Sequence, residues 1–331
     1  MELAGRIIAG LVMEAGLNPT AQVQRWTSAA LERLDEMRAP TRTAVLAAAS
    51  FDAFYAGDMG RAQAFGRRVI EAEDSPMQPL LVASTTLSIT TMAGGDPGLA
   101  IDLLKAGEQR VTSTTPDDWA SGNFACVIGF IANTVGDTAT GAAEAERAVT
   151  LARRAGTPSL LALALGMWAS ALRSHHPAEA LAAAEDSIAL SEAGAGDAGY
   201  ALSLYIAAEL RYQLGDIVGS AVAVIKSIGR AKQLGSRNLD VINIAILPLS
   251  ANAANAEVIV TLAGALDGPL RNTLPFSLLP SDPDRPLRII GAVSATLPTG
   301  VAEAARQRGR SMTYDELIDF TLERLRSGAA M

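Results

Sequence analysis

The side chains most often used in catalysis are few in this chain, and their spacing matches no catalytic pattern. The chain has one cysteine, Cys126, and two adjacent histidines, His175 and His176. A single cysteine excludes an internal disulfide and a multi-cysteine metal site, and two neighbouring histidines are too few for most zinc enzymes. Cys126 lies in an apolar run without an evident histidine partner, so we interpret it as a small core or groove residue and not as a nucleophile.

Two other segments carry weak signals for anion binding, because backbone amides at a helix N-terminus can bind phosphate. The glycine-rich residues 94–98 precede one predicted helix, and the histidine pair precedes another that starts at Pro177. The glycine run lacks a preceding strand, and the chain contains no P-loop motif. We therefore interpret both segments as turns between helices. Acidic pairs at 117–118 and 315–316 lie at predicted helix starts, where the helix dipole favours negative charge.

The composition is that of a globular protein with a large core. The 331 residues are 49% apolar, 19% charged and only 5% aromatic, and a chain of this length buries about three quarters of its unfolded surface. The formal net charge of −8 disfavours a free-standing nucleic-acid binder, because no broadly basic surface is available to neutralise phosphates.

One apolar run raises the question of a membrane span. Residues 241–266 contain a single charge, Glu257, and the run is long enough to cross a bilayer. Pro248 and the segment Asn252-Ala-Ala-Asn255 interrupt it, however, and hydrocarbon tolerates such residues poorly. We therefore predict two buried helices joined by a turn at 252–255. The N-terminus shows no export signal, so we expect a soluble, cytoplasmic protein.

Turn signals recur along the chain with a period of about 39 residues. Four of them are Gly-Asp, and glycine followed by Asp or Pro suits the end of one helix and the start of the next. Apolar residues recur at i, i+3 and i+4 on both sides, and strand signals are nearly absent. The turn positions are Pro19, Asp58, Asp96, Asp137, Pro177, Asp216 and Asn255. The predicted helices are residues 2–15, 20–36, 41–56, 78–94, 98–112, 118–135, 138–155, 158–174, 177–193, 200–214, 217–234, 239–251 and 256–266.

Small residues recur at fixed distances from these turns, which is what closely packed helix pairs require. The positions eight residues before the five middle turns are Ser50, Ser88, Gly129, Ala169 and Ala208. The positions four residues after them are Ala62, Ala100, Gly141, Leu181 and Ser220, and all but Leu181 are small. This pattern resembles the tetratricopeptide repeat, stretched from about 34 residues to about 39. The resemblance covers roughly residues 1–266, although the aromatic positions of that repeat are mostly lost. Another kind of α-solenoid is the alternative.

The chain changes character after Gly268. Prolines at 269, 275, 280, 283 and 286 predict a loop. Helices are predicted to resume near 286–295 and 300–308. Thr313 is expected to cap a last helix, with Glu316 completing a capping box. We predict two parts: a repeat domain at 1–266, and a proline-rich loop with a helical cap packed on the solenoid at 267–331.

The string from Gly309 to Leu322, Gly-Arg-Ser-Met-Thr-Tyr-Asp-Glu-Leu-Ile-Asp-Phe-Thr-Leu, resembles the closing segment of large actinobacterial regulators. Those proteins join an ATP-binding module to a tetratricopeptide-like region, often with a LuxR-type DNA-binding or adenylate cyclase domain. Leu317 stands where that family commonly has alanine. A P-loop, a basic recognition helix and a cyclase motif are all missing. The resemblance is therefore to the repeat region of such a regulator.

The resemblance to the tetratricopeptide repeat also implies which residues face a binding groove. In that repeat the first helix of each pair lines the concave surface, 14, 11, 7 and 4 residues before the turn. Carried over, these positions are Phe51, Phe54, Thr85, Ile89, Met92, Asn123, Cys126, Phe130, Asn133, Arg173, Tyr205, Glu209 and Tyr212. Aromatic, amide and charged side chains together are typical of a binding surface. The alternative is that some of them pack against the next repeat.

The sequence thus predicts an all-α, right-handed solenoid of about seven tetratricopeptide-like hairpins with a helical C-terminal cap. We expect a non-catalytic recognition or sensor domain of a transcriptional or signalling regulator, which binds a protein, a peptide or a small effector. An extended acidic or carboxylate-bearing peptide would suit Arg173, in a continuous patch that runs from Phe130 to Tyr212. A free-standing adaptor or oligomerisation scaffold is the alternative, and an enzyme is the alternative of another class. No cofactor, metal, membrane or direct nucleic-acid partner is predicted, and a homo-oligomer is left open.

Overall fold

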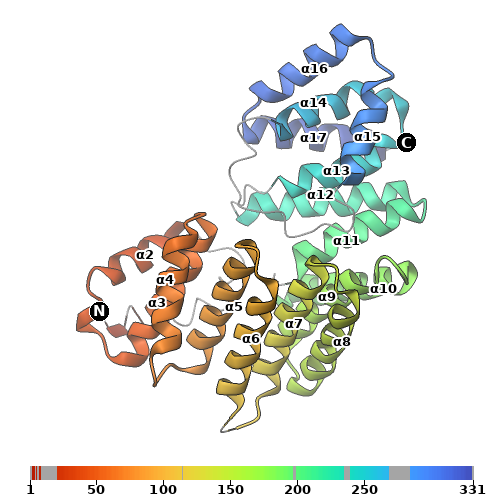
Figure 1. Cartoon of the computed structure of the whole chain (residues 1–331). Coiled ribbons are helices and arrows are strands. Elements are labelled where there is room, and N and C mark those ends of the chain that lie inside the picture. The colour runs from red at the N-terminus through yellow and green to blue at the C-terminus, as the bar shows by residue number, and fades with distance from the viewer. Residues whose placement is uncertain are drawn as a thin grey trace. The chain divides into compact units, whose positions relative to one another are not determined.

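The computed structural model describes residues 2–3, 5, 7–8, 21–113, 115–196, 199–234, 239–267 and 284–329. Every regular element within these ranges is helical (Figure 1). The first half contains α2 (Ala21–Leu31), η1 (Leu34–Glu36), α3 (Ala39–Tyr55), α4 (Met59–Glu71), α5 (Met77–Ala93), α6 (Pro97–Thr112), α7 (Asp118–Thr134), α8 (Thr138–Ala155) and α9 (Pro158–Leu172). The second contains α10 (Pro177–Leu190), η2 (Ser191–Ala195), α11 (Tyr200–Gln213), α12 (Ile217–Leu234), α13 (Asp240–Ser250), η3 (Ala253–Asn255), α14 (Ala256–Leu266), α15 (Asp284–Ser294), α16 (Thr299–Ser311) and α17 (Tyr314–Ala329).

The described chain forms two compact units. The N-terminal unit comprises Met1–Ala171 with Ala189–Tyr200, and the C-terminal unit comprises Leu172–Ile188 with Ala201–Met331. The predicted division of the chain at residue 266 stays a prediction.

The helices follow the predicted repeat closely. No range was predicted for α4, although the repeat requires a helix after the turn at Asp58, and the structure supplies it. The turn at Pro19 and the proline-rich loop lie outside the described residues. The apolar run 241–266 forms α13 and α14 with η3 between them, as predicted. No helix in the described part of the chain is both long and apolar enough to cross a membrane.

The Gly-Asp turns end one helix and start the next with the same two residues. Each glycine has a positive φ, between +79° and +94°, a region that other residues rarely adopt. Each aspartate donates its backbone N–H to the carbonyl five residues earlier, which closes the preceding helix. Its side chain then accepts the N–H three residues later and caps the following helix. The four pairs are Gly57-Asp58, Gly95-Asp96, Gly136-Asp137 and Gly215-Asp216.

The turn between α9 and α10 differs from the others by one residue. Four residues, 173–176, separate these helices, whereas three separate the helices at each Gly-Asp turn. His176 takes the place of the aspartate, because its carbonyl accepts the N–H of Ala180. The small residue four positions later is therefore Ala180, which is fully buried, and not Leu181. The turn predicted at Pro177 was therefore placed one residue too late, which explains why Leu181 was the one large residue at this position.

The predicted small positions lie at buried helix crossings. Ser50 on α3 donates a hydrogen bond of 2.7 Å to the carbonyl of Ala62 on α4. The reverse arrangement occurs in the C-terminal unit, where Ser220 on α12 donates to the carbonyl of Ala208 on α11, also at 2.7 Å. At Gly129 on α7 an added Cβ would lie 3.2 Å from the carbonyl oxygen of Gly141 on α8. Close approach is thus used at these crossings, as the spacing predicted.

Neighbouring repeats are joined by side chains about one period apart. In the N-terminal unit the Arg110 guanidinium on α6 donates to the carbonyls of Ile70 and Ala72 at the end of α4. Arg147 on α8 forms an ion pair with Glu108 on α6 in the same unit. A cation at the C-terminus of a helix satisfies carbonyls that have no partner within the helix. The repeat period therefore organises polar contacts as well as the apolar core.

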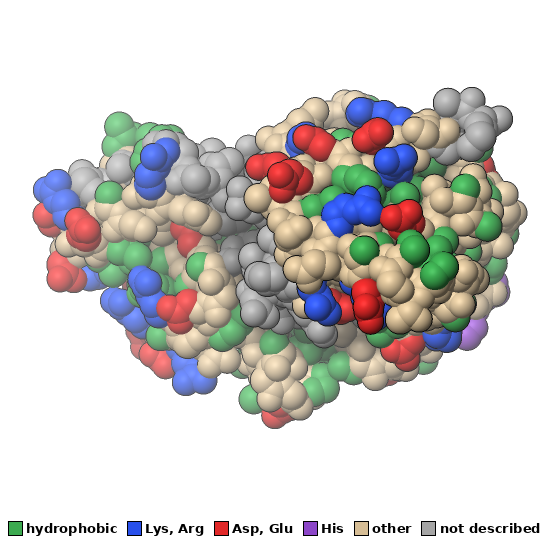
Figure 2. All heavy atoms as spheres, turned by 90° about the horizontal axis from the view of Figure 1, so that it is seen from above, with side chains coloured by type: hydrophobic (Ala, Val, Ile, Leu, Met, Phe, Trp, Pro, Cys, Tyr) green, Lys and Arg blue, Asp and Glu red, His purple; other side chains and the backbone are tan. Residues whose placement is uncertain are grey.

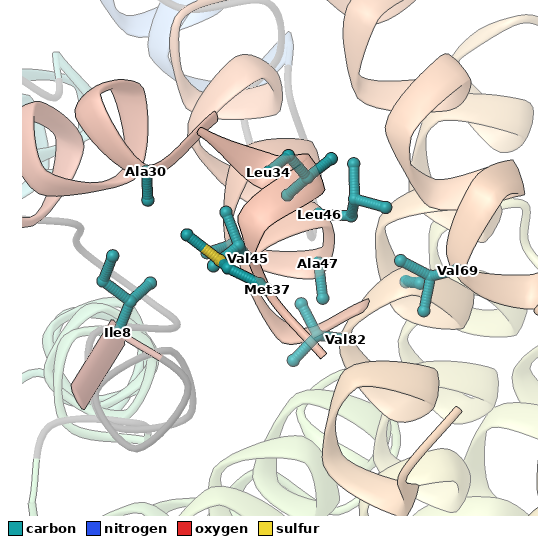
Figure 3. Close-up of a cluster of buried hydrophobic side chains, with 11 residues drawn as sticks. Ile8, Ala30, Leu34, Met37, Val45, Leu46, Ala47, Val69 and Val82 are labelled. Atoms are coloured by element: carbon teal, nitrogen blue, oxygen red, sulfur yellow. The ribbon is translucent and has the colours of Figure 1, made fainter. Parts of the chain in front are cut away.

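Each unit has its own core. In the N-terminal unit, apolar side chains from α2 to α5 converge between the helices, among them Met37, Val45, Leu46, Val69 and Val82 (Figure 3). In the C-terminal unit, α15 and α16 pack against α14, and α17 packs against α12 and α13.

The last helix is capped as predicted. The Thr313 N–H donates to Glu316 Oε2 over 2.8 Å, and the Glu316 N–H donates to Thr313 Oγ1 over 3.3 Å. This reciprocal pair is a capping box.

Candidate functional site

The predicted groove positions of the N-terminal unit lie on α3, α5 and α7, the first helices of their pairs. Phe51, Thr85, Ile89, Met92, Asn123, Phe130 and Asn133 are half-buried. Two further positions require correction: Phe54 is 7% exposed and Cys126 is fully buried. These two side chains pack into the unit and do not line a surface. Burial also raises the pKa of the Cys126 thiol to about 12, so the thiol is a core group.

Several of the half-buried residues are engaged within the fold. Phe51 packs against the core of α2 to α5, and Met92 and Phe130 pack against a second core cluster around Phe124. The Asn123 side chain donates to the Trp119 carbonyl over 2.8 Å. The alternative reading, that some groove positions pack against the next repeat, therefore describes part of this set.

Three charged side chains meet in the C-terminal unit. Two of them were predicted as groove positions, but the Glu209 side chain is as buried as that of Phe54 and also requires correction. Arg173 follows α9, Glu209 lies on α11, and Arg285 lies in the first turn of α15. Arg285 Nη1 donates to Glu209 Oε1 over 3.1 Å, and Arg173 Nη1 lies 3.8 Å from Glu209 Oε2. The side chains of Arg173 and Glu209 are 10% and 4% exposed. We call these three residues the Arg-Glu-Arg cluster.

Arg173 is the member of the cluster whose hydrogen bonding is incomplete. Among the described residues its buried Nη1 has no hydrogen-bond partner, since the 3.8 Å to Glu209 Oε2 is too long for a hydrogen bond. Burial lowers the pKa of Arg173, Glu209 and Tyr205 oppose that shift, and Arg285 adds to it. An unsatisfied buried donor on a charged group costs more than an unsatisfied neutral one. The cluster therefore contains a buried guanidinium donor that makes no hydrogen bond within the described part of the chain.

The surrounding side chains hold α11 in place. Tyr212 shares a hydrogen bond of 3.1 Å with Ser250 on α13. Arg211 binds Glu185 on α10 and the Gly219 carbonyl on α12. Gln213 donates to the same Glu209 oxygen that Arg285 binds, over 3.3 Å. The Glu209 carboxylate is thus oriented by several donors on one side.

Sequence reasoning missed Arg285 and could not have found it by register. It lies 76 residues after Glu209, in the predicted cap and outside the repeat. The predicted continuity of a patch from Phe130 and Asn133 to Arg173 and Tyr212 stays a prediction, because the first two belong to the N-terminal unit and the last two to the C-terminal unit.

The remaining candidate segments are structural. His175 and His176 are exposed in their turn, and residues 94–98 form the turn before α6 and its first residues. Among the described residues, no three His, Cys, Asp or Glu side chains are grouped so that they could hold a metal ion. On the face drawn in Figure 2, basic and acidic side chains of the described residues are interspersed and form no broad basic surface.

A half-buried carboxyl group in the N-terminal unit gives a prediction about pH. Asp52 on α3 is half-buried, and its Oδ2 has no hydrogen-bond partner among the residues that the structure describes. Burial raises the pKa of Asp52 to about 6, and a hydrogen bond with Thr27 opposes the shift. The folded state therefore holds this proton more tightly than the unfolded state, so stability falls as the pH rises from about 4 through 6.

We expect Asp52→Asn to raise the free energy of unfolding at pH 7.5 by about 1–2 kcal/mol, after allowance for solvent screening at a half-buried group. The gain should shrink towards zero near pH 4, where the carboxyl is already neutral in the folded state. Urea denaturation at both pH values measures this, with exposed Asp74→Asn as the matched variant. An equal gain at the two pH values would contradict the assignment of the shift to Asp52.

Comparison with known proteins gives matches in structure alone. No family model and no curated protein matches the chain. A Rap protein solved in complex with Competence and Sporulation Factor matches with a TM-score of 0.57 and 11% identity, over 99% of this chain and 98% of that chain. The apo form of RapI matches with a TM-score of 0.53 and 12% identity, over 98% of both chains. These likenesses show the fold, a tetratricopeptide-like helical solenoid, as predicted.

Proposed function

We propose that this chain is a non-catalytic recognition domain that binds a peptide or an extended segment of a partner protein. The observation that carries the proposal is the likeness, over nearly the whole chain, to a Rap protein solved in complex with Competence and Sporulation Factor. An array of helical hairpins offers a long surface and needs no catalytic group to bind another chain. The half-buried aromatic and amide side chains on the first helices supply the contacts that such binding uses.

The placement of the reactive side chains supports a role without catalysis. The Cys126 thiol is fully buried, and burial raises its pKa to about 12. Asp96, Asp117 and Asp137 cap helices through their carboxylates. A general acid or base has to reach its substrate, and these groups are engaged within the fold. An enzyme remains the alternative of another class.

The regulatory context is a separate part of the proposal and depends on the segment Gly309–Leu322. Its resemblance to the closing segment of large actinobacterial regulators favours a chain that passes a binding signal to an ATP-binding, LuxR-type DNA-binding or cyclase module. In the C-terminal unit this segment has a packing role, because Gly309, Leu317 and Ile318 are buried. The coding sequence upstream of Met1 tests the context: an in-frame P-loop module supports it, and its absence favours the adaptor alternative.

Selection from a random peptide display library, followed by calorimetry on the selected peptides, tests the recognition function. We expect peptides that bind the full chain with one-to-one stoichiometry and no turnover. The same preparation should not hydrolyse ATP, because no phosphate-binding loop is present in the sequence. The control is the same selection on a helical protein of similar charge. If no peptide is enriched more strongly on this chain than on the control protein, the proposed function is wrong.

A further inference from the structure

We propose that the Arg-Glu-Arg cluster is a subsite for one carboxylate group of an acidic peptide, with Arg173 as the residue that binds it. The inference rests on the proposed function and adds the chemical class of the ligand. The observation that carries it is the buried Arg173 Nη1, which has no hydrogen-bond partner in the part of the chain that the structure describes, on a side chain only 10% exposed. An oxyanion of a ligand would accept the hydrogen bond that this guanidinium N–H does not make within the protein.

The geometry of Glu209 explains why it does not complete Arg173 itself. Arg285 and Gln213 both donate to Glu209 Oε1, at 3.1 and 3.3 Å. These bonds hold the carboxylate so that Oε2 stays 3.8 Å from Arg173 Nη1. Glu209 therefore offsets part of the charge of Arg173 but leaves a donor unused. A planar guanidinium presents its N–H groups as a fork that fits the two oxygens of a carboxylate.

The charge of Glu209 also selects the kind of anion. A phosphate dianion bound to Arg173 would lie within a few ångströms of the Glu209 carboxylate, and like charges at that distance repel strongly where solvent is largely excluded. A singly charged carboxylate meets half of that repulsion. Tyr205 lies one helical turn before Glu209 on α11 and adds a phenol close to Arg173. The cluster therefore favours a carboxylate over a phosphate.

Peptide arrays with one fixed residue test the proposal on the full chain. The probes are octapeptides, acetylated and amidated at their ends, in three arrays that are identical apart from glutamate, glutamine or phosphoserine at one fixed position. For the wild-type chain we expect the best glutamate peptides to bind about tenfold more tightly than their glutamine partners. We also expect them to bind more tightly than the phosphoserine partners.

Three variants separate a binding role of the cluster from a structural one. Arg173→Met should abolish the preference for glutamate over glutamine, and Arg173→Lys should reduce it to about twofold to threefold, because lysine keeps the charge but lacks the fork. Glu209→Gln should increase the affinity for glutamate peptides and weaken the discrimination against phosphoserine. Arg211→Lys, on the same helix but outside the cluster, should leave the preference unchanged. Far-ultraviolet circular dichroism and thermal unfolding verify each fold, and if Arg173→Met does not fold, the lysine variant decides.

Each outcome of this experiment decides between the proposals. Peptides that bind with no preference for glutamate overturn the carboxylate subsite and leave the recognition function standing. A preference for glutamate that Arg173→Lys and Arg173→Met both retain places the carboxylate elsewhere and overturns the assignment to Arg173. Tighter binding of the phosphoserine array overturns the choice of carboxylate. If none of the arrays binds, the recognition function is wrong and the subsite is wrong with it.

Discussion

Replacing Gly309 by alanine is expected to lower the free energy of unfolding by about 3–5 kcal/mol. A Cβ at Gly309 on α16 would lie 1.9 Å from the carbonyl oxygen of Thr261 and 2.8 Å from the backbone nitrogen of Ala265, both on α14. Backbone atoms cannot rotate away as a side chain can, so α16 has to move off α14. Overpacking of this kind usually costs about 1–3 kcal/mol, and a clash with backbone belongs at or above the top of that range. Urea denaturation of the full chain measures the loss.

Gly300 on the same helix is the matched control. Apart from its chain neighbours and the backbone of its own helix, no described residue has an atom within 4 Å of a Cβ built there, so Gly300→Ala should be neutral or stabilise the fold by up to about 1 kcal/mol through helix propensity. Similar losses at the two positions would show that α16 does not pack on α14 as described. Gly309 is also the first residue of the segment Gly309–Leu322. Its physical role there is to permit the close crossing of α16 and α14, which only glycine allows.

Replacing Glu209 by alanine is expected to destabilise the fold by about 3–5 kcal/mol. The substitution leaves Arg173 nearly buried without the carboxylate that offsets its charge, and it removes the acceptor of Arg285. Breaking a buried ion pair from one side is costly for this reason, whereas removing both charges is much less so. The double variant Arg173→Met/Glu209→Ala should therefore be more stable than Glu209→Ala alone.

A double-mutant cycle in urea measures the coupling between Arg173 and Glu209. Glu185→Ala is the surface control, because its ion pair with Arg211 is partly exposed and such pairs contribute at most about 1 kcal/mol. Strictly additive losses for Arg173 and Glu209 would show that the two charges do not interact in the folded chain.

The repeat could be predicted from sequence because its signals are local. A Gly-Asp pair specifies a turn through its own backbone and side chain, and the small residues lie within eight positions of it. The one-residue longer turn before Pro177 escaped prediction, since histidine carries no turn signal as specific as glycine. Its effect appeared only as a leucine at a position where a small residue was expected.

The candidate site was harder to predict because its geometry depends on contacts distant in sequence. The burial of Phe54 and Cys126 depends on which face of each helix meets its neighbours, and a repeat register alone does not specify that face. The distance from the repeat turn predicted Arg173 and Glu209, because both lie on or just after the first helix of a repeat. Arg285 reaches Glu209 from a helix that follows the repeat, and no spacing rule connects the two.

The Gly-Asp turns have a consequence for how the chain acquires its structure during synthesis. The bond from Ser50 to Ala62 closes a hairpin across only twelve positions, so little loop-closure entropy is lost before the first buried contact forms. Hairpins of this kind can nucleate one by one as they leave the ribosome, and each finished hairpin offers an apolar face to the next. The boundary between the two compact units falls between Ala171 and Leu172, at the end of α9 and just before a turn without a Gly-Asp pair. We therefore expect folding to propagate less readily across the α9–α10 turn than across the Gly-Asp turns.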